Sequence, residues 1–396
     1  FLIVGWLLFR IRRSSLQLND ARARAQHLAD HDPLTSLANR SMFDRELGER
    51  LAQIRTSGRQ LALLYLDLDH FKNVNDHLGH PTGDLLIVAL SRILAELAPD
   101  DVVARLGGDE FAIVHTADDA AISAGKLCRN IHRALAKPID LGDGEVLIGA
   151  SIGIAIAPLD ATDPVDLVRK ADIALYDAVG KALNVPVHKL IGGACQPRIP
   201  LEWSVSLAND VQTIVNEAKR AVDEFGIKVL CIKAADRRGW KQDVKHFAAV
   251  RKAVGDDLVI GVDPNTGWSM ADALAATHAL REYDLGYIEQ PIDRRDLAGM
   301  AEIRRQAMGI PVMADEALFT VQDAYAIAET RAADAYCIKL YKIGGLTPAK
   351  KIAGIAQAAN IQLNCGGLAV QCQLEAAAGA HFYASTPEKR MMGAAE

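Results

Sequence analysis

Strand-like runs recur through the second half of the chain, and this recurrence constrains its fold more than any other feature. The runs begin near residues 201, 229, 258, 287, 311, 335, 361 and 381, at intervals of 20 to 29 residues, and helix-compatible sequence follows each one. Eight strands that alternate with helices predict a (β/α) barrel. Because the chemistry of such a barrel lies at the carboxyl ends of its strands, a functional site is expected there.

Charged residues stand at the expected ends of successive strands. Asp263, Glu289 and Asp315 follow one another at intervals of 26 residues, so each βα unit supplies one carboxylate and the three are predicted to converge on one cation. Lys233 and Lys339 end the strands on either side of them and would face each other across the metal. A bound Mg²⁺ can stabilise an enediolate while a lysine removes the α-proton of a carboxylate substrate. Structural ion pairs are the alternative interpretation.

Several segments of this half carry a family pattern: VDPNTGW at 262–268, YIEQP at 287–291, MADEA at 313–317, IKLYKIGG at 338–345 and DAVGKALNVPVHKLIGG at 177–193. Together they resemble the enolase superfamily, in particular its muconate-lactonizing and mandelate-racemase-like branches. The resemblance implies that Asp263, Glu289 and Asp315 bind Mg²⁺, with Mn²⁺ as a second candidate, and that Lys233 and Lys339 are an opposed acid/base pair. It implies racemisation, epimerisation, cycloisomerisation or β-elimination of a small carboxylate substrate.

Two departures from that family pattern bear on activity. The usual Lys-x-Lys of the second strand reads Cys231-Ile-Lys233, so one electrostatic helper is absent. Family members also begin with a capping domain that closes over the substrate, whereas here other sequence precedes the barrel. A site without its lid stays open to water and orients its substrate less well. We therefore expect metal binding to be retained better than turnover.

The first half holds a separate acidic constellation within a compact α/β pattern. An apolar strand, LALLYLDL, ends in Asp67 and Asp69, and a hairpin at Gly107-Gly108 carries Asp109 and Glu110. Carboxylates from a strand end and from an opposite turn can hold Mg²⁺ from two sides. Backbone N–H groups after Asp69 can cradle a phosphate. A solvated acidic rim is the alternative interpretation.

The surrounding motifs are DPLTSLANR at 32–40, DLDHFKNVND at 67–76, LGHPTGD at 78–84, RLGGDEF at 105–111, SIGIA at 151–155 and ADIALY at 171–176. They resemble the GGDEF-domain diguanylate cyclases, α/β sandwiches that condense two GTP into cyclic di-GMP as a homodimer. The resemblance assigns metal binding to Asp67, the Leu68 carbonyl and Asp109, and catalysis to Asp109 and Glu110. It assigns guanine recognition to Asn75 and Asp84, and phosphate binding to His70, Phe71 and Lys72.

This half also departs from its family. The inhibitory Arg-x-x-Asp before the signature reads Ala98-Pro-Asp-Asp101, so feedback inhibition through that site is not expected. Val179 and Leu183 occupy the positions of a Lys and an Arg that contact the triphosphate. Two lost charge-assisted contacts at about 1.5–3 kcal/mol each are expected to weaken GTP binding by orders of magnitude.

Composition narrows the classes of protein to which the chain can belong. The 396 residues are 50% hydrophobic and 24% charged, which excludes a disordered chain and a multi-span membrane protein and predicts two or three domains. A net charge of −6 argues against a nucleic-acid partner. Six cysteines without a CxxC pair are typical of reduced cytoplasmic thiols.

The predicted organisation has five parts. Residues 1–13, FLIVGWLLFRIRR, are interpreted as the end of a truncated transmembrane helix that would hold the rest at the cytoplasmic face of the bacterial inner membrane; otherwise the protein is cytoplasmic. Then come a connecting helix (14–30), the cyclase-like domain (31–178), a junction (179–199) and the barrel (200–396). At the junction, KADIALYDAVGKALNV suits both families, so a recombined, misassembled or engineered fusion is favoured over a natural two-domain enzyme. An inactive chimeric scaffold is a further hypothesis.

Overall fold

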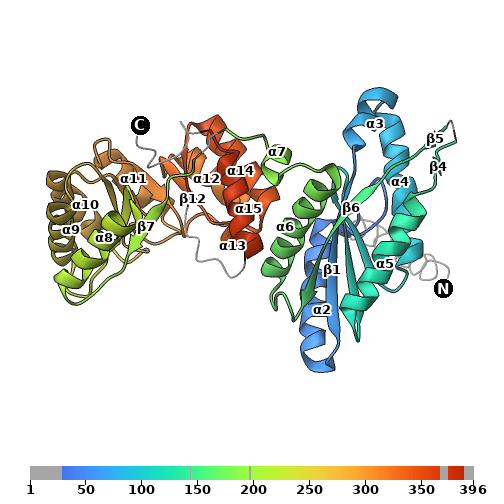
Figure 1. Ribbon diagram of the computed structural model, residues 1–396, viewed down its shortest axis with the longest axis horizontal. Coiled ribbons are helices and arrows are strands. Elements are labelled where there is room, and N and C mark those ends of the chain that lie inside the picture. The colour runs from blue at the N-terminus through green and yellow to red at the C-terminus, as the bar shows by residue number, and fades with distance from the viewer. Residues whose placement is uncertain (1–28, 143, 196–197, 366–372, 388–396) are drawn as a thin grey trace, which may run out of the picture. The chain divides into compact units, whose positions relative to one another are not determined.

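The computed structural model describes residues 29–142, 144–195, 198–365 and 373–387, which form two compact units that divide between Asn184 and Val185. Each unit is α/β, as the sequence predicts (Figure 1). The predicted membrane anchor at 1–13 and most of the predicted connecting helix lie outside the described residues. Among the described helices, none has the length and apolar content that a membrane span needs.

The first unit is built on a four-stranded antiparallel sheet in the order β2-β3-β1-β6. Its elements, with the small β4-β5 hairpin, are α2 (Arg40–Ser57), β1 (Gln60–Leu68), α3 (Phe71–Leu78), α4 (His80–Leu97), β2 (Val102–Gly107), β3 (Glu110–Ala117), α5 (Ala120–Leu135), β4 (Ile139–Asp140), β5 (Glu145–Val146), β6 (Ala150–Ala157) and α6 (Pro164–Leu183).

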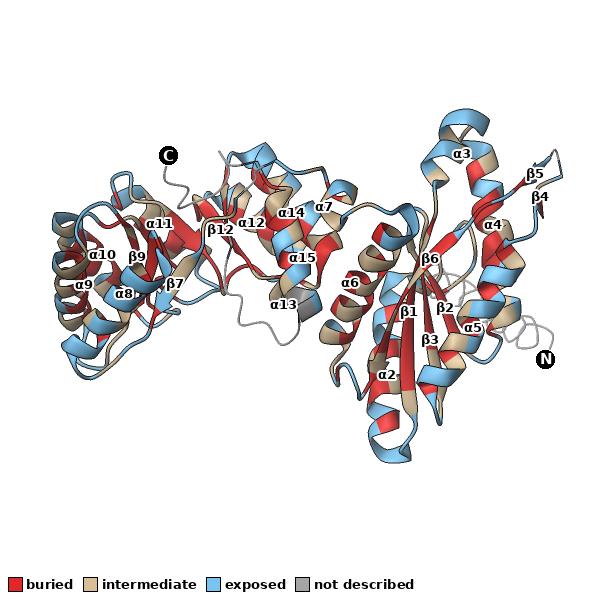
Figure 2. Cartoon of the chain, viewed as in Figure 1, coloured by how far each residue is buried: buried red, intermediate tan, exposed pale blue. Residues whose placement is uncertain are grey.

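Helices cover both faces of this sheet, which explains why its central strand is apolar almost throughout. Alternate residues of β1 enter two different cores: Leu64 and Leu66 pack with α4 and α5, whereas Leu63 and Tyr65 pack with α2 and α6. The strands are accordingly buried along most of their length (Figure 2). The sandwich therefore leaves its polar residues at the end of β1, beside the β2-β3 turn.

The second unit is a seven-stranded sheet in which every neighbouring pair is parallel and the strand order follows the chain. Its strands are β7 (Glu202–Val205), β8 (Val229–Lys233), β9 (Val259–Asp263), β10 (Tyr287–Glu289), β11 (Val312–Ala314), β12 (Ala335–Ile338) and β13 (Gln362–Cys365). Asn364 of β13 donates a hydrogen bond of 2.9 Å to Glu202 of β7, so side chains of the first and last strands meet inside the curved sheet.

Helices alternate with these strands, as in a (β/α) barrel, with α7 (Val187–Leu190) before β7 and α15 (Gln373–Ala384) after β13. The connecting elements are α8 (Val211–Phe225), α9 (Trp240–Val254), α10 (Met270–Leu280), the 3₁₀ turn η1 (Arg281–Tyr283), α11 (Leu297–Gln306), α12 (Val321–Thr330), α13 (Leu340–Ile343) and α14 (Leu346–Ala359).

The strand predicted near residue 381 is wrong, because α15 continues through His381 to Ala384. The aromatic pair Phe382 and Tyr383 favours a strand by propensity, but a run of alanines precedes it. Ala378 and Phe382 are four residues apart and both buried, as one face of a helix requires.

Candidate functional sites

The end of β1 gathers the acidic residues of the first unit. Asp67 pairs in register with Glu110 of β3, and Asp109 stands in the turn just before Glu110. Burial, together with the neighbouring carboxylates of Asp109, Glu110 and Asp69, raises the pKa of Asp67 to about 7. Burial also raises the pKa of Asp109. Carboxylates crowded in this way suit an oxygen-preferring divalent cation such as Mg²⁺.

Glycine and arginine shape the turn that carries Asp109. Gly107 and Gly108 have φ of 142° and 56°, a region that glycine tolerates and other residues rarely adopt. Arg105 donates from Nε and Nη2 to the Gly108 carbonyl at 3.0 and 2.9 Å, and from Nη1 to Asp32 at 3.1 Å. The ion pair of Arg105 with Asp32 was not predicted, although both residues lie inside the quoted motifs.

The turn after β1 begins α3 and leads to the predicted phosphate contacts. His70 adopts φ of 61° immediately before Phe71, the first residue of α3, and Lys72 in the first turn of α3 is exposed. Leu68, whose carbonyl is the predicted metal ligand, ends β1 between Asp67 and Asp69. The carboxylate of the neighbouring Asp69 accepts a 2.8 Å hydrogen bond from the Ser151 hydroxyl.

The predicted guanine-binding residues lie on two helices that pack against each other. Asn75 lies in α3 and Asp84 in α4, and α3 packs against α4. A Cβ atom on Gly83 would lie 2.0 Å from Asn75 Oδ1, so the absence of a side chain at 83 lets Asn75 lie against α4 beside Asp84.

The positions where the family pattern places two cations lie on the last turns of α6. Val179 is partly buried and packs against the core that contains Phe43 and Leu175. Leu183 is 41% exposed. Lys181, between them, forms an i,i+4 ion pair of 2.6 Å with Asp177. Neither Val179 nor Leu183 offers a charge to a triphosphate.

The barrel brings its five predicted residues to one end of the sheet. Lys233 of β8 forms an ion pair with Asp263, its neighbour in register on β9. Lys339, just after β12, lies 2.5 Å from Asp315 and 3.9 Å from Glu289. The lysines therefore stand on opposite sides of three carboxylates that come from consecutive strands.

The acidic and basic side chains at this end of the barrel lie close enough to shift one another's pKa values. Burial raises the pKa of Glu289 to about 8, and the neighbouring Asp263 and Asp315 contribute to the rise. Burial alone would raise the pKa of Asp315, but the ammonium groups of Lys342 and Lys339 outweigh it and lower that pKa. Burial opposes the charge on Lys339, yet its acidic neighbours raise its pKa. The three carboxylates fit Mg²⁺ as a donor set.

Two further residues shape the barrel site and were not predicted. Lys342 donates to the carboxylate of Asp315 and, at 2.6 Å, to its carbonyl. The amide oxygen of buried Gln290 accepts from the backbone N–H groups of Asp315 and Ala317 at 3.1 and 2.9 Å. The only sequence signals for them were their places within the motifs IKLYKIGG and YIEQP.

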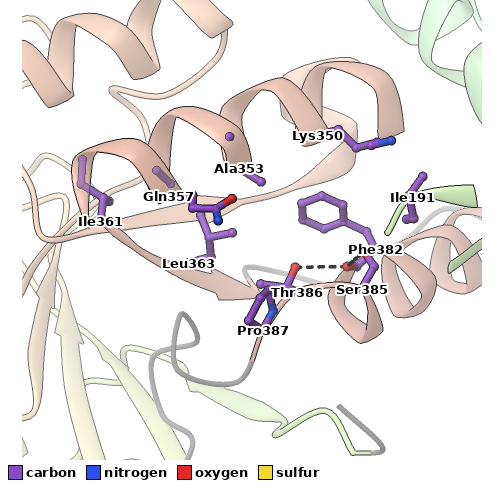
Figure 3. Close-up of a pocket in the computed structure, with 12 residues that line it drawn as sticks. Ile191, Lys350, Ala353, Gln357, Ile361, Leu363, Phe382, Ser385, Thr386 and Pro387 are labelled. Carbon is purple, nitrogen blue, oxygen red and sulfur yellow. Dashed lines mark hydrogen bonds between the residues drawn. The ribbon is translucent and has the colours of Figure 1, made fainter. Parts of the chain in front are cut away.

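A distinct cavity of about 210 Å³ lies between α14, β13 and α15 (Figure 3). Phe382 and Leu363 form part of its wall, Thr386 donates at 3.1 Å to the Phe382 carbonyl, and Lys350 is the one charged residue among those that line it. None of the predicted site residues lines this cavity.

Comparisons with known proteins match the two units to two different families. Residues 29–184 match the diguanylate cyclase GGDEF domain and residues 213–395 match the enolase C-terminal domain-like family. The diguanylate cyclase TpbB of Pseudomonas aeruginosa is 40% identical over 178 residues, which are 44% of this chain and 41% of that protein. An N-succinyl-L-Arg/Lys racemase of Bacillus cereus is 37% identical over 211 residues, 53% of this chain and 56% of that protein.

Among solved structures, muconate cycloisomerase from Pseudomonas fluorescens superposes with a TM-score of 0.52 at 32% identity, over 56% of this chain and 60% of that one. The matched part of the chain spans about half the length of each of the two curated relatives, TpbB and the N-succinyl-L-Arg/Lys racemase. Two different families match two separate stretches of one chain. Residues 29–184 are therefore a GGDEF-family domain, and residues 213–395 belong to the enolase C-terminal domain-like family.

Proposed function

We propose that the first unit is a diguanylate cyclase that condenses two GTP into cyclic di-GMP and releases two pyrophosphates. The observation that carries this proposal is the crowding of Asp67, Asp109 and Glu110 beside the glycine turn. In this proposal Asp67, Asp109 and the Leu68 carbonyl hold Mg²⁺ or Mn²⁺. The ion would lower the pKa of the attacking 3′-hydroxyl and neutralise charge at the α-phosphate.

The chain's own residues bind and orient GTP. Asn75 of α3 lies against Gly83 of α4, which precedes Asp84, and the two polar side chains would read the guanine edge. In this proposal Lys72 and the backbone N–H groups of His70 and Phe71 would bind phosphate oxygens. Because one domain presents one nucleotide, the reaction needs a second copy of the domain, and we propose a homodimer.

An Asp-to-Asn substitution tests this proposal. Asp67→Asn removes a carboxylate and is expected to abolish cyclic di-GMP formation from GTP and Mg²⁺ while circular dichroism stays unchanged. Asp118→Asn, at the exposed other end of β3, is the matched control and is expected to keep full turnover. Wild-type turnover by Asp67→Asn would refute the assignment.

A second candidate function rests on Lys233 and Lys339, which flank the three carboxylates of the barrel. We propose a Mg²⁺-dependent site that removes the α-proton of a small carboxylate substrate, with the two lysines as acid and base. An N-succinyl amino acid is a suitable probe, since a relative is an N-succinyl-L-Arg/Lys racemase. Exchange of its α-proton in D₂O should be lost in Lys233→Ala and retained in Lys245→Ala, which alters an exposed lysine of α9. Metal binding without any exchange would leave the barrel as an inactive scaffold.

A further inference from the structure

Three polar side chains of the first unit form a continuous chain of hydrogen bonds, the Asp-His-Ser triad of Asp101, His115 and Ser123. His115 Nδ1 lies 2.7 Å from Asp101 Oδ2, and His115 Nε2 lies 2.7 Å from Ser123 Oγ. Because an ionised carboxylate only accepts hydrogen bonds, Nδ1 carries the proton in its pair with Asp101. Nε2 of the neutral imidazole is then an acceptor, so the Ser123 hydroxyl donates to it.

The backbone of three elements places these side chains together. Val102, the first residue of β2, pairs in register with Val114 of β3, so Asp101 and His115 are the next residues opposite each other. The hydroxyl comes from α5, which follows β3 in the chain and packs against it. Ser123 stands in the first turns of that helix. The triad is therefore fixed by strand register and helix packing together.

The triad is open to small reagents from solvent. The side chains of His115 and Asp101 are 17% and 10% exposed, and Ser123 is partly buried. Ser123 also lies near the N-terminal end of α5, a helix of 16 residues, where the helix dipole is positive. Negative charge that develops on a group bonded to Ser123 Oγ would be stabilised there.

The triad lies away from the acidic residues of the same unit. His115 pairs with Ala62 near the start of β1, whereas Glu110 pairs with Asp67 near its end. Five residues of extended strand separate His115 from Glu110, which is about 17 Å along β3. Chemistry at Ser123 would therefore need neither GTP nor the metal proposed for the cyclase.

We propose that Ser123 is a nucleophile that hydrolyses small carboxylic esters, with His115 as its general base and Asp101 as the residue that positions the imidazole. Ser123 Oγ bonds to the ester carbonyl carbon while its proton passes to His115 Nε2. The bond to the alcohol oxygen then breaks, and that oxygen takes the proton from Nε2. Water attacks the acyl group in the same way and gives a proton to Nε2, which returns one to Ser123 Oγ as the acid leaves.

A fluorophosphonate probe on the full chain tests the nucleophile, because an Oγ–P bond forms on an activated serine while the P–F bond breaks and fluoride leaves. Mass spectrometry of the digested wild type should find the probe on Ser123. The wild type should also hydrolyse p-nitrophenyl acetate. Ser123→Ala should lose both reactions. Ser41→Ala, which alters an exposed serine in the first turn of α2, is the matched control and should keep both.

Two further variants distinguish the triad from a hydroxyl that is merely accessible. His115→Gln keeps a polar side chain but removes the base, so labelling of Ser123 should slow by about 100-fold or more. Asp101→Asn keeps the shape of the carboxylate, but its amide can hold the wrong imidazole tautomer, so labelling should slow by about tenfold or more while circular dichroism stays unchanged.

Several results would overturn the proposal. An unlabelled Ser123 in the wild type, or labelling without ester hydrolysis, would do so. An unchanged labelling rate in His115→Gln would also do so, because the imidazole would then not act as the base. If His115→Gln fails to fold, as circular dichroism would show, the decision passes to Asp101→Asn, in which an unchanged rate would overturn the proposal.

Discussion

At the scale of single residues, Arg105 joins two motifs that lie far apart in the sequence. Its guanidinium contacts the Gly108 carbonyl and the Asp32 carboxylate at once, and its side chain is only 13% exposed. Burial would raise the pKa of Asp32, but hydrogen bonds from Thr35 and Arg105 outweigh it and lower that pKa. The glycine turn that presents Asp109 is thus anchored to the beginning of the domain.

Replacing this guanidinium should therefore cost more than a surface arginine would. Arg105→Met takes a buried cation from the Asp32 carboxylate, which keeps its hydrogen bonds from Thr35, and takes two donors from the Gly108 carbonyl. We expect a loss of about 1–3 kcal/mol in the free energy of unfolding. Urea denaturation measures it. Arg59→Met breaks a largely exposed pair with Asp118 and is expected to cost less than about 1 kcal/mol. Equal losses in the two variants would contradict this account of Arg105.

A pair of histidines makes the second unit sensitive to pH. His381 Nδ1 lies 3.2 Å from His188 Nδ1, which joins α15 to α7. Burial lowers the pKa of His381 below 6.5, and His188 adds to the effect. The unfolded chain then binds a proton at a higher pH than the folded one, so stability is fully present above pH ~6.5 and falls as the pH drops.

We expect the melting temperature of the second unit to fall between pH 7 and pH 5. His381→Gln should flatten that decline, whereas His278→Gln, which alters an exposed histidine of α10, should leave it unchanged. Thermal unfolding followed by circular dichroism at several pH values measures both. A decline in His381→Gln as steep as in the wild type would assign the pH dependence to other groups.

At the scale of elements, α6 lies directly on β6 because Gly153 has no side chain. A Cβ atom at 153 would lie 2.3 Å from the Ala171 carbonyl oxygen and 2.3 Å from the Leu175 nitrogen. These are backbone atoms of α6, so they move only if the helix moves. Gly153→Ala should cost about 1–3 kcal/mol or more by overpacking.

Gly125→Ala is the matched control for this prediction, because Gly125 lies within α5 and the nearest atom to its Cβ would be Arg129 Nη1 at 3.6 Å. Alanine favours a helix over glycine by about 0.5–1 kcal/mol, so this variant should be slightly stabilised. Denaturant titration of both variants gives the two free energies. A neutral Gly153→Ala would mean that α6 does not rest on β6 as described.

The elements that could be predicted from sequence are those whose residue pattern directly reflects their burial or their backbone conformation. The apolar run of β1, buried on both faces, and the glycine turn before Asp109 are of this kind. The predicted strand near His381 was wrong. Phe382 and Tyr383 favour a strand locally, but Phe382 is buried with Ala378 on one face of α15, and this packing outweighs the local preference. Gln290 and Lys342 were missed because they act through turns that follow strand ends, where no periodicity marks a side chain's direction.

At the scale of the whole molecule, a net charge of −6 averages over two acidic sites that lie in separate units. Each unit has its own hydrophobic core and its own cluster of acidic residues, in which burial and neighbouring carboxylates raise the pKa of Asp67 in the first unit and of Glu289 in the second. The segment that suits both families, which begins at Lys170, lies largely within α6, so the sequence junction falls inside a helix of the first unit. Ligands of one site should therefore stabilise one unit.

Differential scanning calorimetry of the full chain tests this independence. A ligand that binds only the folded form at 100 times its Kd stabilises by about 2.7 kcal/mol, which raises the corresponding transition by several degrees. A non-hydrolysable GTP analogue with Mg²⁺ should raise one transition, and that shift should vanish in Asp67→Asn. An N-succinyl amino acid added with Mg²⁺ should raise the other beyond the effect of Mg²⁺ alone, and that added shift should vanish in Asp263→Asn. If either ligand moved both transitions together, the units would unfold as one cooperative body and the division at Asn184 would not be a thermodynamic boundary.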